Sequence, residues 1–277
     1  MKLIEQCVTM LQSSRDTDLP ELFKFIETIG RVCYKSEDKI TENSYQGFIN
    51  RIISSGHLSV LEHGTVYLFI RSNELSIRRP DIETLLSSPY TFYNVLNGAL
   101  YITTNYRVLV ENHIEQLYNN YSVVQYDQHI PRITFKFICS RAIANELVRH
   151  RVFSFSQEST RYCNYSKDKF DNQLTFIKPY WYTGVNEGGI IANENEGIFN
   201  FTLEDSERRY FELLKGGMQP QQARDILPLA LKTELVMTGT LPQWQDFIKL
   251  RESPNAHPDI QILAKKVKET IYDMFRI

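Results

Sequence analysis

Apolar residues recur at helical spacing near the start of the chain. The triplet Asp-Leu-Pro at 18–20 is typical of a helix N-terminus, and leucine and isoleucine then follow at intervals of three and four residues. A second helix is predicted from about Ser44 to Ser55, with Gly56 just past its end. Its buried residues are expected to be Phe48, Ile49, Ile52 and Ile53.

Other apolar runs predict strands over 3–10, 64–70, 132–139 and 174–177. The run RITFKFIC is the most regular of them. In it Ile133, Phe135 and Phe137 alternate with polar residues, which is the period of a strand. The run GTVYLFI is rich in β-branched and aromatic residues, which favours a buried strand.

Residues 72–131 lack this regularity. Pro80, Pro89, Pro131 and the polar stretch ENHIEQLYNNYS interrupt the pattern. We interpret the segment as a mostly helical insertion within a single domain formed by residues 1–277.

Helices are expected to dominate the rest of the chain. One is predicted over 140–149, with Ile143 and Leu147 facing inward, and the composition of 185–197 indicates a surface loop. The last third is expected to be helical, with a helix that stops at Gly216-Gly217, a restart at Pro220, and helices over 242–250 and 258–275. Strands first and helices later, without a βαβ rhythm, indicate an α+β fold.

Composition and charge narrow the class of protein. The chain has 277 residues, of which 31 are Lys or Arg and 33 are Asp or Glu, so its formal charge is −2. This balance argues against a protein that coats nucleic acid by bulk positive charge.

No apolar run approaches the roughly 20 residues of a membrane span, and the N-terminal residues lack the apolar stretch of a signal peptide. The four cysteines form neither a CxxC pair nor a metal-spaced cluster, so we expect reduced thiols in a cytoplasmic protein without a metal site.

The densest polar chemistry is the segment VRHRVFSFSQESTRYCNYS at 148–166. It combines arginines and a histidine with serines, a threonine and an amide, and Glu158 is its single acid. Planar guanidinium donors beside small hydroxyl donors suit a phosphate and a pyrimidine edge, which predicts an anion-binding loop for a nucleotide. The alternative is a helix end that runs into a solvated loop.

Three other segments are candidates. In SGHLSVLEHG (55–64), a metal site would use His57, Glu62 and His63, but their spacing fits neither zinc-protease pattern, and the alternative is a core or turn histidine. Arg224 and Arg251, taken singly, are typical of helix surfaces. No GxGxxG motif or P-loop is present, so a Rossmann or Walker site has no support.

Together, four segments resemble the flavin-dependent thymidylate synthases. The family signature of RHR, seven residues and Ser-x-Arg is present as Arg149-His150-Arg151, VFSFSQE and Ser159-Thr160-Arg161. The segments GHLSVLEH, QQARDILP and FIKLR match the flanking segments of the family in the same order, from about Cys33 to Arg251.

The resemblance implies an enzyme that makes dTMP from dUMP. Methylenetetrahydrofolate would supply the carbon unit, and NADPH would supply reducing equivalents through bound FAD. It also implies an α+β fold with a mixed antiparallel sheet and helices packed on it, in a homotetramer with active sites between subunits. The expected partners are small molecules, without a nucleic acid or a membrane.

The resemblance also assigns site residues. Arg251 would be catalytic, by holding the uracil ring in its N3-ionised form, and His57 would lie near the flavin and folate face. The expected dUMP-binding residues are Glu146, Arg149, Gln157, Ser159, Thr160, Arg161, Arg224 and Arg251. The expected flavin-binding residues are Ser59, Glu62, Arg149, His150, Arg151, Gln157, Thr240 and Asp246.

The chain departs from the family pattern at several positions. Thr240-Leu241-Pro242 stands where members of the family frequently have Asn and Arg, and Asp246 stands where they frequently have Asn or His. Gln157 stands where some members have Glu, and Cys33 stands where others have Ser. A flavin contact near residue 240 would then come from the backbone or from Thr240.

Three alternatives remain open from the sequence. One is a related flavoenzyme that methylates a uracil in tRNA, and another is a non-catalytic nucleotide- or RNA-binding protein. The third is a thymidylate synthase with a cysteine nucleophile, for which Cys163 is the candidate, because cationic surroundings would lower its pKa.

Overall fold

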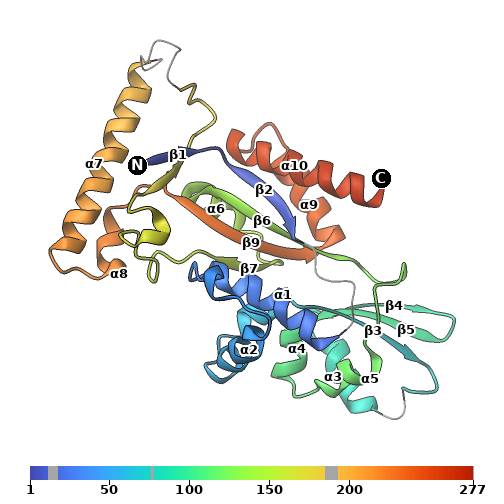
Figure 1. Ribbon diagram of the computed structural model, residues 1–277. Coiled ribbons are helices and arrows are strands. Elements are labelled where there is room, and N and C mark those ends of the chain that lie inside the picture. The colour runs from blue at the N-terminus through green and yellow to red at the C-terminus, as the bar shows by residue number, and fades with distance from the viewer. Residues whose placement is uncertain (12–17, 76–77, 185–192, 277) are drawn as a thin grey trace.

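The computed structural model of the chain describes residues 1–11, 18–75, 78–184 and 193–276. In this part, helices pack on sheets that are mostly antiparallel, which confirms the α+β class (Figure 1). Three sheets are formed in the described residues, with strand orders β2-β6-β9-β7, β3-β5-β4 and β1-β8.

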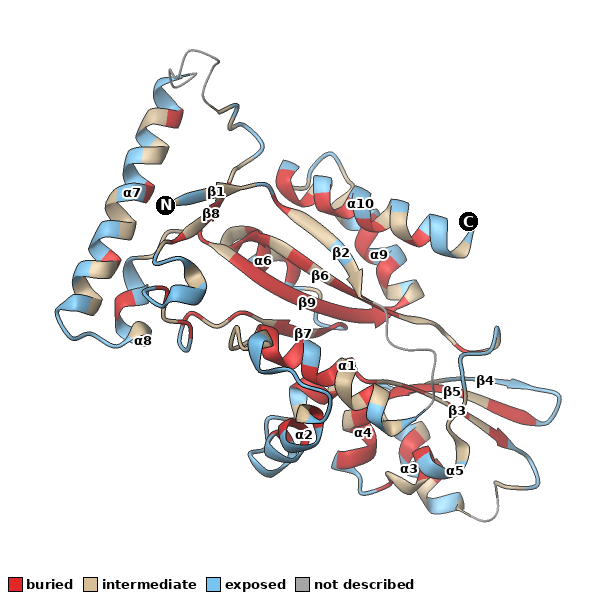
Figure 2. Cartoon of the chain, viewed as in Figure 1, coloured by how far each residue is buried: buried red, intermediate tan, exposed pale blue. Residues whose placement is uncertain are grey.

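The four-stranded sheet is the centre of the molecule. It consists of β2 (Cys7–Leu11), β6 (Arg132–Ser140), β9 (Lys232–Thr240) and β7 (Ser154–Gln157), all paired antiparallel. Figure 2 shows β9 buried along almost its whole length, because it has a strand on each side and helices over both faces. The prediction that the last third is helical is therefore wrong at β9. A strand buried on both faces has no polar alternation to mark it.

Aromatic side chains fill one face of this sheet beneath α6 (Arg141–Leu147), α9 (Leu241–Arg251) and α10 (Pro258–Phe275). Trp244 of α9 is fully buried, and its indole N–H donates to the carbonyl of Ile133 at 3.0 Å. The Trp244 ring also meets Phe153 and Phe135 edge-on, at centroid distances of 4.7 and 4.9 Å. On the opposite face, Val236 packs under α1 (Leu19–Val32).

The second sheet corrects the interpretation of 72–131. Besides α3 (Arg79–Ser87), α4 (Tyr106–Glu111) and α5 (Gln116–Tyr121), this segment contains β4 (Phe92–Leu96) and β5 (Ala99–Asn105). They form a hairpin whose Asn97-Gly98 turn has positive φ at both residues, 50° and 71°. Asn-Gly is the sequence that favours such a turn. Strand β5 is central in the sheet, beside β3 (Thr65–Arg71), so the segment is not mostly helical.

The first predicted strand is divided in two. β1 (Lys2–Ile4) pairs in parallel with β8 (Thr175–Ile177), whereas β2 joins the central sheet. The break lies at Gln6, whose buried side chain donates to the carbonyl of Asp259 at 2.9 Å.

Helices α7 (Glu194–Lys215) and α8 (Pro220–Ala223) contribute to a core with residues near β8.

Several other boundaries are as predicted. Asp18 caps α1, and α2 (Ser44–Ser54) is followed by Gly56 with a φ of 70°. Ile53, however, is 39 % exposed rather than buried. The helix predicted over 140–149 ends at Leu147. In the predicted loop at 185–197, residues 185–192 lie outside the described part, and α7 already begins at Glu194.

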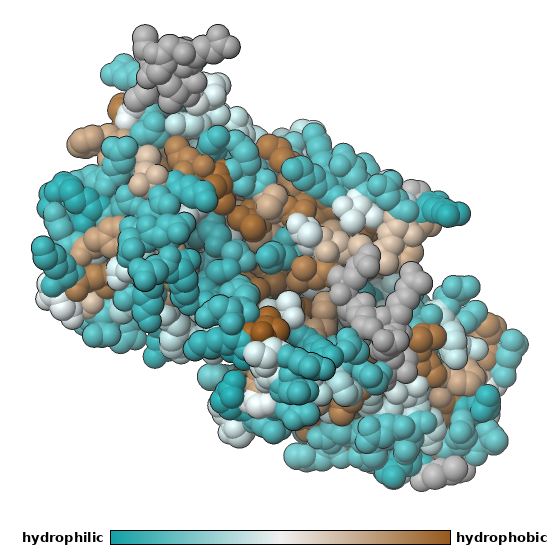
Figure 3. All heavy atoms as spheres, viewed as in Figure 1, coloured by the Kyte–Doolittle hydropathy of each residue, from teal (hydrophilic) through white to brown (hydrophobic). Residues whose placement is uncertain are grey.

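The surface of the molecule is mainly polar. Figure 3 shows hydrophilic side chains over most of one face, with apolar ones gathered near its middle, over the central sheet. Among the described residues, no helix is long and apolar enough to cross a membrane.

The buried indole of Trp244 makes a direct stability prediction. Trp244→Ala should lower the free energy of unfolding by about 3–5 kcal/mol, because it leaves a cavity and removes a buried hydrogen bond. The other tryptophan, Trp181, is 40 % exposed, so Trp181→Ala should cost about 1 kcal/mol or less. Urea unfolding of both variants measures the difference, and equal losses would contradict this packing.

Candidate functional site

The arginine-rich segment is only partly the loop that its composition predicted. It leaves α6 at Leu147, turns, and then forms β7, which pairs with β9 from Thr238 to Leu235. Burial alternates along it, with buried residues at Ser154, Ser156, Glu158 and Thr160 and more accessible residues between them. The segment therefore has an inner face, turned toward the protein, and an outer face.

Polar side chains hold the inner face. The ring of His63, at the end of the 3₁₀ helix η2 (Leu58–His63), lies 3.1 Å from the hydroxyl of Ser156 and 2.7 Å from that of Thr238. Arg132 lies 3.4 Å from the Ser154 hydroxyl. Burial, and then the charge of Arg132, lower the pKa of His63 to about 3. His63 is therefore neutral near pH 7 and ties η2 to the sheet.

The outer face and the adjoining turn present cations. Arg149, Arg151 and Arg161 are exposed, and in the described part of the chain none of their guanidinium groups has a carboxylate partner. The only acid of the segment, Glu158, points inward and pairs with Lys232 at 2.8 Å. The accessible polar groups of the segment are thus mainly guanidinium, hydroxyl and amide groups, which is the donor set that phosphate prefers.

Arg251 lies beside the start of this segment. It donates from Nε to His150 Nε2 at 2.9 Å, and from its other nitrogens to the Glu146 carboxylate at 2.8 Å and the Glu146 carbonyl at 3.0 Å. Burial, and then the Arg251 charge, lower the pKa of His150 to about 4. A neutral His150 can accept this bond, so three residues of the predicted site form one cluster.

The far end of the segment contacts other elements. Gln157 donates to the Thr233 hydroxyl at 3.3 Å, and the Ser159 N–H donates to the carbonyl of Cys33 at 3.0 Å. Arg161 donates to Gln221 of α8 at 3.3 Å, and α8 leads directly into the exposed Arg224. The structure thus brings Arg161 close to the element that precedes Arg224.

Thr160 is 7 % exposed and belongs to the inner face.

The predicted flavin residues of 57–62 lie on the element that His63 ties to β7. His57 and Ser59 are exposed at the start of η2, and Glu62 pairs with Arg107 at 2.5 Å. The metal interpretation finds no support, because no group of three potential metal ligands lies together in the described residues. The core interpretation is confirmed for His63.

Two predicted flavin residues lie on α9. The hydroxyl of Thr240 is buried and caps this helix, accepting from the N–H of Gln243 at 3.4 Å, whereas Asp246 is exposed. Because the Thr240 hydroxyl is used in the cap, the structure does not present this side chain to a ligand.

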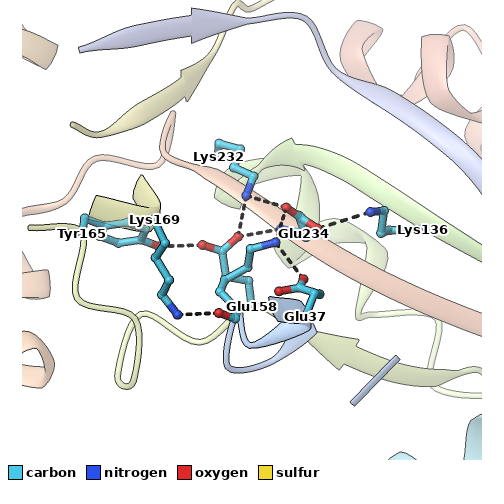
Figure 4. Close-up of polar contacts among 8 residues, drawn as sticks. Glu37, Lys136, Glu158, Tyr165, Lys169, Lys232 and Glu234 are labelled. Atoms are coloured by element: carbon cyan, nitrogen blue, oxygen red, sulfur yellow. Dashed lines mark hydrogen bonds and ion pairs between the residues drawn. The ribbon is translucent and has the colours of Figure 1, made fainter. Parts of the chain in front are cut away.

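A cavity of about 580 Å³ lies behind the inner face. Lysines and glutamates line this cavity, from β6, from β9, from the residue after β7 and from the turn after α1. Figure 4 shows the connected network that they form. The network includes Lys35, Lys136, Lys232, Glu37, Glu158 and Glu234. Burial would raise the pKa of Glu234, but Lys232 and Lys35 outweigh it and lower that pKa to about 2.

A comparison with protein families decides the identity of the fold. The family described as "Thymidylate synthase complementing protein" matches residues 128–275, which include β6, β7, β9 and the helices that cover them. The chain belongs to this family.

Relatives of this family member are similar over most of its length. A protein named flavin-dependent thymidylate synthase from Corynebacterium efficiens is 22 % identical over 95 % of this chain and 83 % of its own. A protein of the same name from Mycobacterium sp. (strain KMS) is 27 % identical over 90 % of this chain and 75 % of its own length. Another from Pyrococcus abyssi is 30 % identical over 52 % of this chain and 61 % of its own length.

Cys163 does not have the environment of a nucleophile. Its thiol is 1 % exposed, and burial, assisted by Glu158, raises its pKa to about 12. The expectation that cationic surroundings lower this pKa is wrong, because removal from water outweighs the nearby lysines.

The inner face holds the residues whose role the sequence did not reveal. His63 was a candidate only for a metal or a core, and Glu158 was merely the one acid of its segment. The alternation of the run Ser-Phe-Ser-Gln-Glu-Ser-Thr is visible in the sequence and would have placed Glu158 on the same face as Ser156.

The low pKa of His63 makes acid stability a test of the inner face. The folded pKa is about 3 against 6.5 for the free side chain, so the unfolded chain binds more protons between these values. Stability should therefore fall as the pH falls from about 6.5 toward 3. His63→Gln should be less stable at pH 7 but lose less free energy of unfolding across this range.

Urea unfolding at a series of pH values measures this slope. His57→Gln is the control, because it changes an exposed histidine and leaves His63 and its two hydroxyl partners in place. This variant should keep the slope of the unmodified protein. A slope that His63→Gln leaves unchanged would contradict a neutral, buried His63.

Proposed function

We propose that this chain catalyses the reductive methylation of dUMP to dTMP, with methylenetetrahydrofolate as carbon donor and NADPH as reductant through bound FAD. The observation that carries the proposal is a cationic face free of carboxylates at 149–161, directly beside the Glu146–His150–Arg251 cluster. The names of the family relatives give the same reaction class.

In this proposal the outer face binds dUMP. Arg161 and the Ser159 hydroxyl would hold the phosphate, with Arg224 approaching from the element after α8. A dianionic phosphate favours such a set, since guanidinium groups bind it with paired hydrogen bonds. Gln157, Glu146 and Arg149 complete the proposed nucleotide contacts, whereas Thr160 is left out because it is buried on the inner face.

Arg251 would act on the uracil ring. Uracil C5 becomes nucleophilic when negative charge develops along the N3–C4–O4 edge, and a fixed cation in a shielded site stabilises that charge. The Arg251 side chain is 14 % exposed, and its two partners fix its orientation. Arginine cannot serve as a general base at neutral pH, so its proposed role is electrostatic.

The chain also offers a donor set for FAD. The guanidinium groups of Arg149 and Arg151 are exposed, and Ser59 and His57 are exposed on η2, which His63 ties to β7. These groups fit a pyrophosphate and the electron-rich edge of an isoalloxazine. Bound FAD would supply the transfer of reducing equivalents from NADPH. His150, Glu62, Gln157 and Asp246 are the remaining side chains proposed to contact it.

We further propose a homotetramer in the cytoplasm. Two large apolar side chains one turn apart on α7 support association, since Ile198 is 60 % exposed and Phe201 is 72 % exposed in the single chain.

Chromatographic detection of dTMP tests the reaction. Purified protein with FAD, NADPH, methylenetetrahydrofolate and dUMP under anaerobic conditions should form dTMP only when both FAD and NADPH are present. Cys163→Ala should retain this activity, because the buried thiol has no part in it. Absence of dTMP despite bound FAD and dUMP would overturn the proposal, and tRNA uracil would then be assayed as the acceptor.

Arg251→Ala tests the catalytic assignment. This variant should fold and retain FAD, yet lose about 10²–10³-fold in kcat, because it removes a charge that acts mainly in the transition state. Lys249→Ala, an exposed cation near the same end of α9, is the matched control and should stay near the activity of the unmodified protein. Near-normal turnover of Arg251→Ala would remove Arg251 from the mechanism.

A further inference from the structure

We propose that Glu158 is a positioning residue for nucleotide binding, anchored under β7 so that the flanking Gln157 and Ser159 face the ligand. This inference rests on the proposed function. It assigns a role to a residue that contacts no substrate in that proposal.

The backbone changes partner at Glu158. Its N–H donates to the carbonyl of Glu234 at 2.8 Å, which extends the pairing of β7 with β9 by one residue. The next N–H, from Ser159, donates instead to Cys33 at the end of α1. The segment therefore leaves β9 at Glu158 and passes on to α1. The orientation of Glu158 fixes the face to which its neighbours Gln157 and Ser159 turn.

The carboxylate of Glu158 is held from three directions. It accepts from the Tyr165 hydroxyl at 3.0 Å, from Lys232 Nζ at 2.8 Å and from the N–H of Glu234 at 3.2 Å, and the residue is 1 % exposed. A buried carboxylate requires such partners, because its desolvation is otherwise costly. The ion pair with Lys232 thus opposes any rotation of Glu158 toward the outer face.

A reversal of this orientation would damage the proposed site in two ways. A shift by one residue would move Gln157 and Ser159 to the inner face, since strand side chains alternate. It would also turn a carboxylate toward the face of Ser159 and Arg161, where it would compete with the phosphate for their donors and repel it.

Glu158→Gln is the decisive variant. Glutamine has nearly the same shape and can still accept from Tyr165, but its amide cannot replace the charge opposite Lys232. The dissociation constant for dUMP, measured by calorimetry on the FAD-loaded protein, should rise about tenfold. FAD content and kcat at saturating dUMP should stay within about twofold of the unmodified protein.

Glu37→Gln is the matched control. Glu37 belongs to the same network and pairs with Lys35 at 2.8 Å, but it has no contact with β7 among the described interactions. Its dUMP affinity should be unchanged. If Glu158→Gln does not fold, Tyr165→Phe removes one bond to the same carboxylate and should weaken dUMP binding severalfold.

The outcomes separate this inference from the proposed function. Unmodified protein that binds no dUMP would overturn both. Unmodified protein that binds dUMP, beside a Glu158→Gln variant with the same affinity, would overturn only the positioning role. A loss of FAD together with dUMP affinity and kcat would indicate general damage and would also overturn it.

Discussion

The arrangement of the arginine-rich segment depends on one buried ion pair, between Glu158 after β7 and Lys232 at the start of β9. Seventy-four positions separate the two residues in sequence, yet their charged atoms lie 2.8 Å apart. The pair keeps the only acid of the segment away from the arginines of its outer face. Without it, the segment would carry its own competitor for the proposed phosphate ligand.

The same division into two faces continues along β7. Ser154 and Ser156 turn inward to Arg132 and His63, and these contacts connect η2 and the proposed flavin residues to the sheet that carries the proposed nucleotide residues. Polar groups that are buried and fully paired make such a connection rigid. At the other end of the segment, α9 carries Arg251 at its C-terminus, and the packing of Trp244 against the sheet fixes the direction of that helix.

Local signals were sufficient for much of the fold. The Asp18 cap, the glycine after α2 and the alternation of β6 identified these elements from neighbouring residues alone. The hairpin β4–β5 had a comparable signal in Asn97-Gly98, which the irregular surrounding sequence obscured. Strand β9 had none, because its identity as a strand comes from its burial between β6 and β7.

The candidate site divides in the same way. The order of motifs indicated Arg149 to Arg161 and Arg251, and the structure brings Glu146, His150 and Arg251 together. The roles of these residues remain proposals. The proposed role of Glu158 depends on its ion pair with a lysine from a distant strand, which no local pattern predicts.

The most direct measurement of the whole account is an experimental structure of the protein with FAD and dUMP. The account predicts the dUMP phosphate on Arg161 and Ser159, its uracil beside Arg251, and the Glu158 carboxylate still on Lys232. A nucleotide bound instead among the lysines of the cavity behind β7, or a Glu158 turned outward, would contradict it.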